Sequence, residues 1–225
     1  MRHLVALCVV VGLVAAVLAA DEKAAGEKFE LPKPGADGKI AIFNGKDLTG
    51  WSGDTEVWQV EDGELVGRSL KGLKQNNFLK SRFEVSDFRL VFEVKLTPNS
   101  ANSGVQFRSV PWQGHEMKGY QADIGQGWWG KLYEESARAL KVLEKQPDGD
   151  RFVKKGDWNL YEIVAVGDRV LIALNGNQTV DLTDPKGDKK GLIAPQVHSG
   201  GPTEVRFRKM TLEVNPKAEL ETVKK

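Results

Sequence analysis

The segments 102–110, NSGVQFRSV, and 119–138, GYQADIGQGWWGKLYEESAR, decide the fold. Polar and apolar residues alternate with a period of two in both segments. Successive side chains of a β-strand point to opposite faces, so this alternation predicts two strands with one apolar face and one polar face. The polar face is expected to carry four side chains: Gln106, Arg108, Gln121 and Asp123.

The polar face has the composition of a sugar-binding surface. Hydroxyl groups need hydrogen-bond donors and acceptors, and the CH faces of sugars stack on aromatic rings. The same stretch continues with side chains that could serve such a ligand: Trp128, Trp129, Glu134, Glu135 and Arg138. The alternative is an ordinary solvated face, because the outer face of an antiparallel sheet is always polar.

Most of the remaining chain also has the pattern of short strands. Phe88 to Leu96 alternates almost strictly, and Asp62-Gly63 and Asn175-Gly176 are signals for tight hairpin turns. Residues 158–166, 169–175 and 178–182 form a predicted three-strand meander. About ten to twelve strands with turns between them predict an all-β fold, a two-sheet antiparallel jelly-roll sandwich. Its core is expected to include Phe92, Val94, Val105, Phe107, Tyr120 and Ile124. The only helical pattern is a weak one at 133–144.

The ends of the chain differ from this central region. Residues 1–20 combine Arg2 and His3 with an apolar run and a final Ala-Ala, which is typical of a cleaved secretory signal. We therefore expect a secreted or periplasmic protein without stable membrane insertion after signal removal. Residues 21–39 are predicted to be a flexible N-terminal segment, 40–214 a single domain, and 215–225 a frayed polar tail.

Composition and missing motifs exclude several functional classes. The 225-residue chain has a formal charge of +1, which gives no electrostatic footprint for nucleic acid. Its single cysteine, Cys8, lies within the signal, GxSxG and Walker A motifs are absent, and no GxGxxG motif opens a predicted helix. His115-Glu116 does not continue into HExxH. No cofactor and no metal site is predicted; acidic pairs at 148/150 and 181/184 are interpreted as surface turns rather than calcium ligands.

A later segment adds two residues to the candidate face. In LIAPQVHSGG, residues 192–201 of the chain, Gln196 and His198 share one parity. If that parity faces the same way as Asp123, both side chains join the polar surface. The sequence does not show whether the strands are neighbours.

Several motifs together resemble a known family. IFNGKDLTGW, WQVEDGELVG, NSGVQFR, GYQADIG, the WNLYEIVAVGDRVLIALNG run, QVHSGG and EVRFRKM occur in order over residues 40–214. They resemble the domain of unknown function family 1080, also called the 3-keto-disaccharide hydrolase domain. The resemblance implies a concanavalin A-like, laminin-G-like jelly roll whose concave face binds a glycoside oxidised at C3.

The resemblance also implies site residues. The NSG-x-x-x-R signature corresponds to Asn102, Ser103, Gly104 and Arg108, and the late pair to Gln196 and His198. Many members have GYE-x-Q where this chain has Gln121 and Asp123, so the acid stands two positions further along the strand, about 6–7 Å away.

The chemistry of a 3-keto-glycoside requires a base, an enolate stabiliser and an acid. Our hypothesis makes Asp123 the base that removes the C2 proton, Arg108 and His198 the enolate stabilisers, and Glu134 or Glu135 the proton donor. It depends on Arg108 and Asp123 sharing one face. Direct hydrolysis by two carboxylates stays open. So do a non-catalytic, lectin-like carbohydrate-binding module and a laminin-G-type interaction domain.

Overall fold

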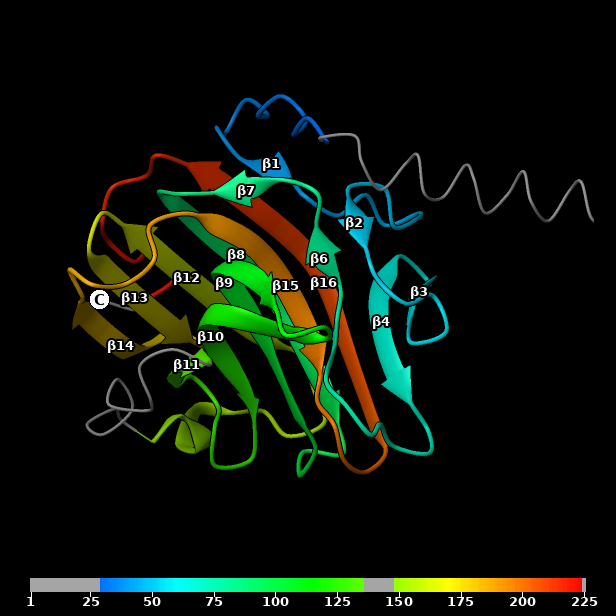
Figure 1. Cartoon of the computed structure of the whole chain (residues 1–225). Helices are drawn as coiled ribbons and strands as arrows, with labels where there is room; N and C mark the ends of the chain where they lie inside the picture. The colour runs from blue at the N-terminus through cyan, green and yellow to red at the C-terminus, as the bar shows by residue number, and fades with distance from the viewer. Residues whose placement is uncertain (1–28, 136–147, 224–225) are drawn as a thin grey trace, which may run out of the picture.

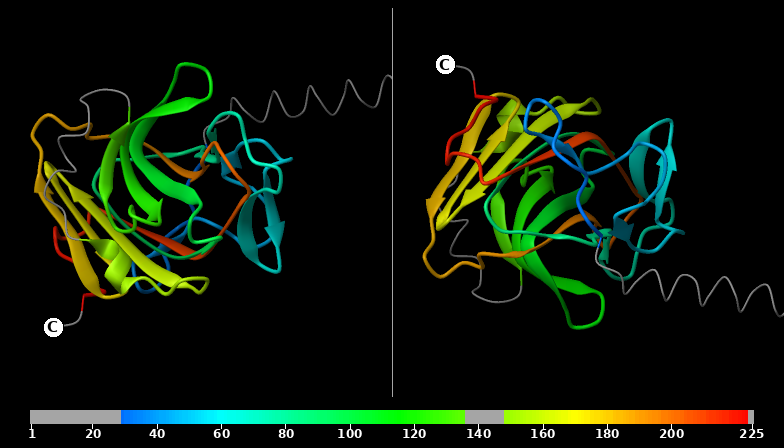
Figure 2. Two further views of the ribbon diagram at one scale, coloured as in Figure 1. Left: turned by 90° about the horizontal axis from the view of Figure 1, so that it is seen from below. Right: turned by 90° about the horizontal axis from the view of Figure 1, so that it is seen from above.

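The computed structural model describes residues 29–135 and 148–223, and these form two packed antiparallel sheets (Figure 1; Figure 2 shows them from below and from above). The larger sheet has eight strands in the order β14-β13-β12-β8-β16-β4-β3, with β1 beside β16. Its strands are β1 (Ile40–Ala41), β3 (Trp58–Glu61), β4 (Glu64–Ser69), β8 (Phe88–Thr97), β12 (Asn159–Val166), β13 (Arg169–Leu174), β14 (Asn177–Thr183) and β16 (Thr203–Val214).

The smaller sheet carries the predicted polar face. It has six strands in the order β11-β10-β9-β15-β5, with β7 beside β15. Its strands are β5 (Asn77–Phe78), β7 (Glu84–Val85), β9 (Asn102–Trp112), β10 (Glu116–Gly125), β11 (Leu132–Glu135) and β15 (Gly191–Val197). Strands β2 (Trp51–Ser52) and β6 (Lys80–Ser81) pair separately, and a short 3-10 helix spans Gly149–Phe152. The predicted two-sheet sandwich is confirmed.

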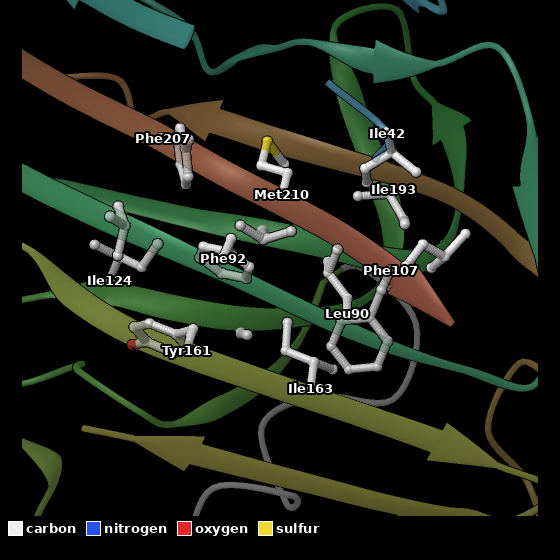
Figure 3. Close-up of a cluster of buried hydrophobic side chains, with 14 of the residues drawn as sticks. Ile42, Leu90, Phe92, Phe107, Ile124, Tyr161, Ile163, Ile193, Phe207 and Met210 are labelled. Atoms are coloured by element: carbon white, nitrogen blue, oxygen red, sulfur yellow. The ribbon is translucent and has the colours of Figure 1, made fainter. Parts of the chain in front are cut away.

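The core lies between the two sheets, where apolar side chains from both inner faces meet (Figure 3). Phe92 on β8 stacks on Tyr161 on β12 with ring centroids 5.3 Å apart. Burying such rings removes a large apolar area from water, which is the main force that holds two sheets together. All six side chains that alternation assigned to the core are buried: Phe92, Val94, Val105, Phe107, Tyr120 and Ile124.

The two predicted hairpin turns have the backbone conformation that their residues favour. Asp62 and Gly63 both have positive φ, at 51° and 78°, as do Asn175 and Gly176, at 51° and 81°. Two consecutive positive φ values define the turn type whose twist matches that of paired strands. The meander β12-β13-β14 is therefore present as expected.

Two segments differ from their expected structure in the residues that the structure describes. The predicted helix at 133–144 begins instead as strand β11, and residues 136–147 lie outside the described part. The end of the chain is not frayed as far as residue 223, because Glu162 accepts hydrogen bonds from the main-chain N–H groups of Glu221 and Thr222. No described helix has the length and apolar character needed to cross a membrane. The signal segment 1–20 also lies outside the described residues.

Candidate functional site

A pocket of about 370 Å³ opens on the face of the six-stranded sheet that points away from the core. We call this surface the outer face. Strands β9, β10 and β11 and the segment after β15 supply most of the lining, and a loop before β5 completes it. The lining residues are Asn76, Asn102, Gln121, Asp123, Trp128, Tyr133 and His198.

Asp123 is the acidic residue of this pocket, and a residue of the opposite sheet fixes its main chain. The hydroxyl of Tyr161, in the opposite sheet, donates a 2.6 Å hydrogen bond to the carbonyl of Asp123. The same hydroxyl accepts one from the N–H of Gly130 at 2.8 Å. Burial raises the pKa of Tyr161, so it remains a donor at any physiological pH. The Asp123 side chain is only 3% exposed.

A chain of side-chain hydrogen bonds orients the Asp123 carboxylate. The hydroxyl of Ser109 donates to Oε1 of Gln106 at 2.6 Å, and Nε2 of Gln106 donates to Oε1 of Gln121 at 3.2 Å. Nε2 of Gln121 then donates to Oδ1 of Asp123 at 2.8 Å and to Oε1 of Gln196 at 3.4 Å. Each amide has one end fixed by its neighbour, so the NH₂ group of Gln121 faces the carboxylate. Gln106 and Gln196 therefore lie buried around Gln121 and do not line the pocket.

Gly104 leaves the space in which the Gln121 side chain lies. A Cβ atom at position 104 would stand 2.5 Å from Cδ of Gln121. Any larger residue would displace the amide that contacts Asp123. The glycine of the NSG segment thus has a steric role in the site.

His198 lies immediately after β15 and presents one ring nitrogen for chemistry. Its Nδ1 is 2.6 Å from the carbonyl oxygen of Ser199. A carbonyl only accepts, so Nδ1 carries a proton, and Nε2 of the neutral ring has a lone pair. Nε2 makes no hydrogen bond with a described residue. His198 can therefore take up and return a proton at Nε2.

The two adjacent tryptophans have different roles. Trp128 is 38% exposed and lines the pocket, with its ring edge-to-face against Tyr133 at 6.3 Å. Trp129 is 1% exposed and packs in the core near Tyr161, while its Nε1 donates to Asn99. The expectation that Trp129 contacts substrate is wrong, because the turn between β10 and β11 sends the second indole inward.

Arg108 does not join the outer face, and the expectation that it shares a face with Asp123 is wrong. A bulge places both Arg108 and Ser109 opposite Gly119, and Arg108 adopts a positive φ of 49°. This extra residue reverses the alternation, so Ser109 takes the place beside Gln106.

The Arg108 guanidinium instead donates to the carbonyls of Ser86 and Gly167 and to Oδ1 of Asp87, at 2.7 to 2.9 Å. These acceptors lie in the connections before β8 and after β12, in the opposite sheet. Burial lowers the pKa of Arg108, and the nearby Asp87 carboxylate opposes this effect. Arg108 is therefore a structural link between the sheets. The predicted site, which required Arg108 and Asp123 on one face with Arg108 as an enolate stabiliser, is wrong in that form.

Glu134 also faces the core and not the pocket. It pairs with Tyr120, whose side chain is in the core, whereas the neighbouring Tyr133 pairs with Gln121 and lines the pocket. Glu134 thus faces inward and is not the proton donor of this pocket. Glu135 pairs through its main chain with Gly119, and its side chain and all of Arg138 lie outside the described part.

The structure adds two residues that sequence reasoning missed. Tyr133 could have been found only from the pairing of β11 with β10. Asn76 comes from a loop without periodicity, so no sequence signal marked it. Asn102 was expected, and its Oδ1 is buried without a hydrogen-bond partner among the described residues.

The acidic pairs considered for calcium have structural partners. Asp148 caps the 3-10 helix by accepting from the N–H of Asp150, and Asp181 pairs with Arg169 at 2.9 Å. Among the described residues, no group of three or more histidine, cysteine or acidic side chains could hold a metal ion.

Comparison with known proteins places the chain in a family. Residues 38–213 match the model of the 3-keto-alpha-glucoside-1,2-lyase-like domain. The chain belongs to this family. No curated protein is significantly similar to this 3-keto-alpha-glucoside-1,2-lyase-like chain in sequence.

Solved structures share its sandwich. A proposed glycosyl hydrolase from Parabacteroides distasonis ATCC 8503 has 22% identity and a TM-score of 0.61, covering 78% of this chain and 98% of its own. A second such structure from the same organism has 20% identity and a TM-score of 0.59, covering 80% and 95%. The carbohydrate-binding module CBM66 from Bacillus subtilis has 22% identity and a TM-score of 0.57, covering 73% and 95%. At these identities the similarity shows the fold alone.

Proposed function

We propose that the pocket binds a glycoside oxidised to a ketone at C3 and that the protein cleaves its C1–O bond by elimination. Membership of the 3-keto-alpha-glucoside-1,2-lyase-like family supports the substrate class. The observation that carries the proposal is the meeting of a buried carboxylate, Asp123, and an imidazole, His198, in one pocket beside the exposed Trp128.

The two groups match the proton transfers of the reaction. The carboxylate of Asp123 removes the C2 proton, and the electrons of the C–H bond form a C2–C3 enolate. When the C3 ketone re-forms, these electrons make a C1–C2 double bond and the C1–O bond breaks. Nε2 of protonated His198 gives its proton to the departing oxygen. Water can then add to the unsaturated sugar.

Because Arg108 lies outside the pocket, side-chain amides recognise the substrate in this proposal. The side chains of Asn76, Asn102 and Gln121 line the pocket, and Asn102 makes no side-chain hydrogen bond with the described residues. Its side-chain NH₂ group is available as a donor to the enolate oxygen. Trp128 offers a ring face for the CH groups of the sugar.

The second candidate function is non-catalytic carbohydrate binding. The absence of Arg108 and Glu134 from the pocket favours it, because what remains is rich in amides and poor in charge. Such a lining suits hydroxyl recognition as well as catalysis.

The substitution Asp123→Asn separates the two functions. An amide keeps an acceptor for hydroxyl groups but is too weak a base to remove a carbon-bound proton. We expect turnover of a 3-keto-glycoside to be lost while Kd changes less than about tenfold, or about 1.4 kcal/mol. Trp128→Ala should mainly weaken binding. If the wild type binds sugars but converts neither 3-keto nor ordinary glycosides, the binding module is the correct function.

A further inference from the structure

We infer that Glu116, at the start of β10, is a positioning residue for His198 and acts on it through Asn76 and Ser199. This inference rests on the proposed function, in which His198 protonates the departing oxygen. Glu116 is not among the residues that line the pocket of Asp123 and His198. Its side chain is 22% exposed and contacts the site through the amide of Asn76.

The end of the β9-β10 hairpin bends back over the outer face, which brings Glu116 to this site. In the order of the six-stranded sheet, β9 and β15 separate β10 from β5. Nevertheless Met117 on β10 packs in one buried cluster with Phe78 on β5 and Ala194 on β15. The bend follows the bulge at Arg108, since an extra residue in one strand bends that strand. The bulge that removes Arg108 from the outer face therefore also curves the hairpin toward the pocket.

Glu116 helps to decide which way the amide of Asn76 faces. Nδ2 of Asn76 donates to both carboxylate oxygens of Glu116, at 3.1 and 3.2 Å. Oδ1 of Asn76 accepts a 2.9 Å hydrogen bond from the main-chain N–H of Ser199. A carboxylate only accepts and an N–H only donates, so the amide fits between them in one orientation. Without the carboxylate, only the hydrogen bond from Ser199 still favours that orientation.

Ser199 connects Asn76 to the His198 ring. The N–H that Asn76 accepts belongs to the peptide group between His198 and Ser199. The carbonyl oxygen of Ser199 lies 2.6 Å from Nδ1 of His198 and accepts a hydrogen bond from it. The hydrogen bond at one ring nitrogen decides which nitrogen carries the proton, so this contact leaves Nε2 for the departing oxygen. A rotation of the Ser199 main chain moves the carbonyl, and the ring then loses the acceptor that fixes it.

The main chain around this site keeps another support when these side chains are replaced. Leu73 and Gly200 exchange two main-chain hydrogen bonds, at 3.0 and 2.8 Å. These bonds involve no side chain, so they remain in variants of Glu116 or Asn76. We therefore expect such variants to fold, with His198 displaced and the pocket retained.

The test compares two substrates that differ in the basicity of the departing oxygen. Methyl 3-keto-α-glucoside releases a strongly basic alkoxide and needs an acid, whereas 4-nitrophenyl 3-keto-α-glucoside releases a weakly basic phenolate and does not. In Glu116→Leu we expect kcat to fall at least about tenfold for the methyl glucoside and less than about twofold for the 4-nitrophenyl glucoside. A general loss of structure would lower both values alike. Glu84→Leu, which removes an exposed carboxylate paired with Lys190, is the control and should change neither value.

An exchange of the two side-chain types supplies a rescue. In Asn76→Asp two carboxylates face each other, so we expect the same selective loss as in Glu116→Leu. In the double variant Asn76→Asp, Glu116→Gln the new amide donates to the new carboxylate, whose other oxygen still accepts from Ser199. The kcat for the methyl glucoside should then return to within about threefold of the wild-type value, which shows that the two positions act as a pair.

The tautomer of His198 gives a measurement that needs no substrate. In ¹H–¹⁵N spectra of the neutral ring, assigned with the variant His198→Gln, the wild type should carry the proton on Nδ1. Glu116→Leu should show a mixture of the two tautomers, because the Ser199 carbonyl no longer keeps its place.

The outcomes separate the positioning role from the proposed function. Equal losses or no loss for the two substrates in Glu116→Leu, or no rescue in the double variant, would overturn the positioning role while the proposed elimination stands. If the wild type converts neither substrate, the proposed function fails and the tautomer decides alone. A proton that stays on Nδ1 in Glu116→Leu then overturns the positioning role as well, and a mixture of tautomers supports it.

Discussion

The side-chain amide of Gln121 donates a 2.8 Å hydrogen bond to Oδ1 of Asp123, two positions further along β10. Both side chains lie on the outer face, and Gln121 is itself held by Gln106 and Gln196. A buried carboxylate keeps a defined orientation only where such donors hold it. The amide chain is thus the part of the site that aims the proposed base.

Removing this donor should reduce catalysis more than binding. We expect Gln121→Leu to lower kcat by about 100-fold, because a carboxylate displaced by about 1 Å no longer reaches the C2 proton. KM should change much less. Steady-state kinetics with a 3-keto-glycoside gives both values. Gln59→Leu, an exposed glutamine on β3, is the control, and an unchanged kcat in Gln121→Leu would show that the hydrogen bond has no positioning role.

The space left by Gly104 predicts a second route to the same defect. In Gly104→Ala the added methyl group would lie 2.5 Å from Cδ of Gln121, so the amide must move. We expect a loss of kcat similar to that of Gln121→Leu and a decrease in unfolding free energy of about 1–3 kcal/mol. Gly201→Ala, where nothing lies within 4 Å, should change neither quantity. Normal activity of Gly104→Ala would mean that Gln121 has more room than its contacts indicate.

Arg108 should matter for stability and not for the chemical step. Arg108→Lys cannot reproduce three hydrogen bonds from one planar group, so part of this partly buried hydrogen-bond set is lost. We expect the unfolding free energy, measured by urea denaturation, to fall by about 3 kcal/mol while kcat/KM of the folded protein is retained. Arg169→Lys, in an exposed ion pair, should cost less than about 1 kcal/mol. A selective loss of kcat in Arg108→Lys would return Arg108 to the catalytic site.

The C-terminal segment should be held by Glu162. This buried carboxylate pairs with Arg89 at 2.9 Å and accepts from the backbone of Glu221 and Thr222. In Glu162→Gln an NH₂ group faces these donors, and Arg89 loses a buried partner, so we expect a loss of about 3 kcal/mol in unfolding free energy. Glu84→Gln, which breaks an exposed pair with Lys190, is the matched control. Equal stability of the two variants would contradict the structural role of Glu162.

Export should remove the first residues of the chain. The Arg2-led apolar run predicts that exported protein begins near Asp21 and contains no cysteine, since Cys8 is removed with the signal. N-terminal sequencing of material outside the cytoplasm measures this directly. Exported protein that still begins with Met1 would contradict a cleaved signal.

The sequence alone determined the sandwich, most of its core and the position of Asp123. Alternation over residues 88–96 and 119–124 decided which side chains are buried, because a strand has only two faces and water excludes apolar groups from one of them. Asp62-Gly63 and Asn175-Gly176 predicted their turns because few residues tolerate positive φ. These are local properties of the backbone, so a short window of sequence contains them.

Only the tertiary structure decided which polar residues meet. A bulge of one residue turned Arg108 away from Asp123, and nothing in the alternation of NSGVQFRSV reveals an extra residue. The pairing of β11 with β10 placed Tyr133, and not Glu134, on the outer face. Asn76 and His198 reach the pocket from segments far apart in the chain. Register and long-range packing depend on contacts between distant segments, and a period-two pattern, which describes one strand at a time, carries no information about them.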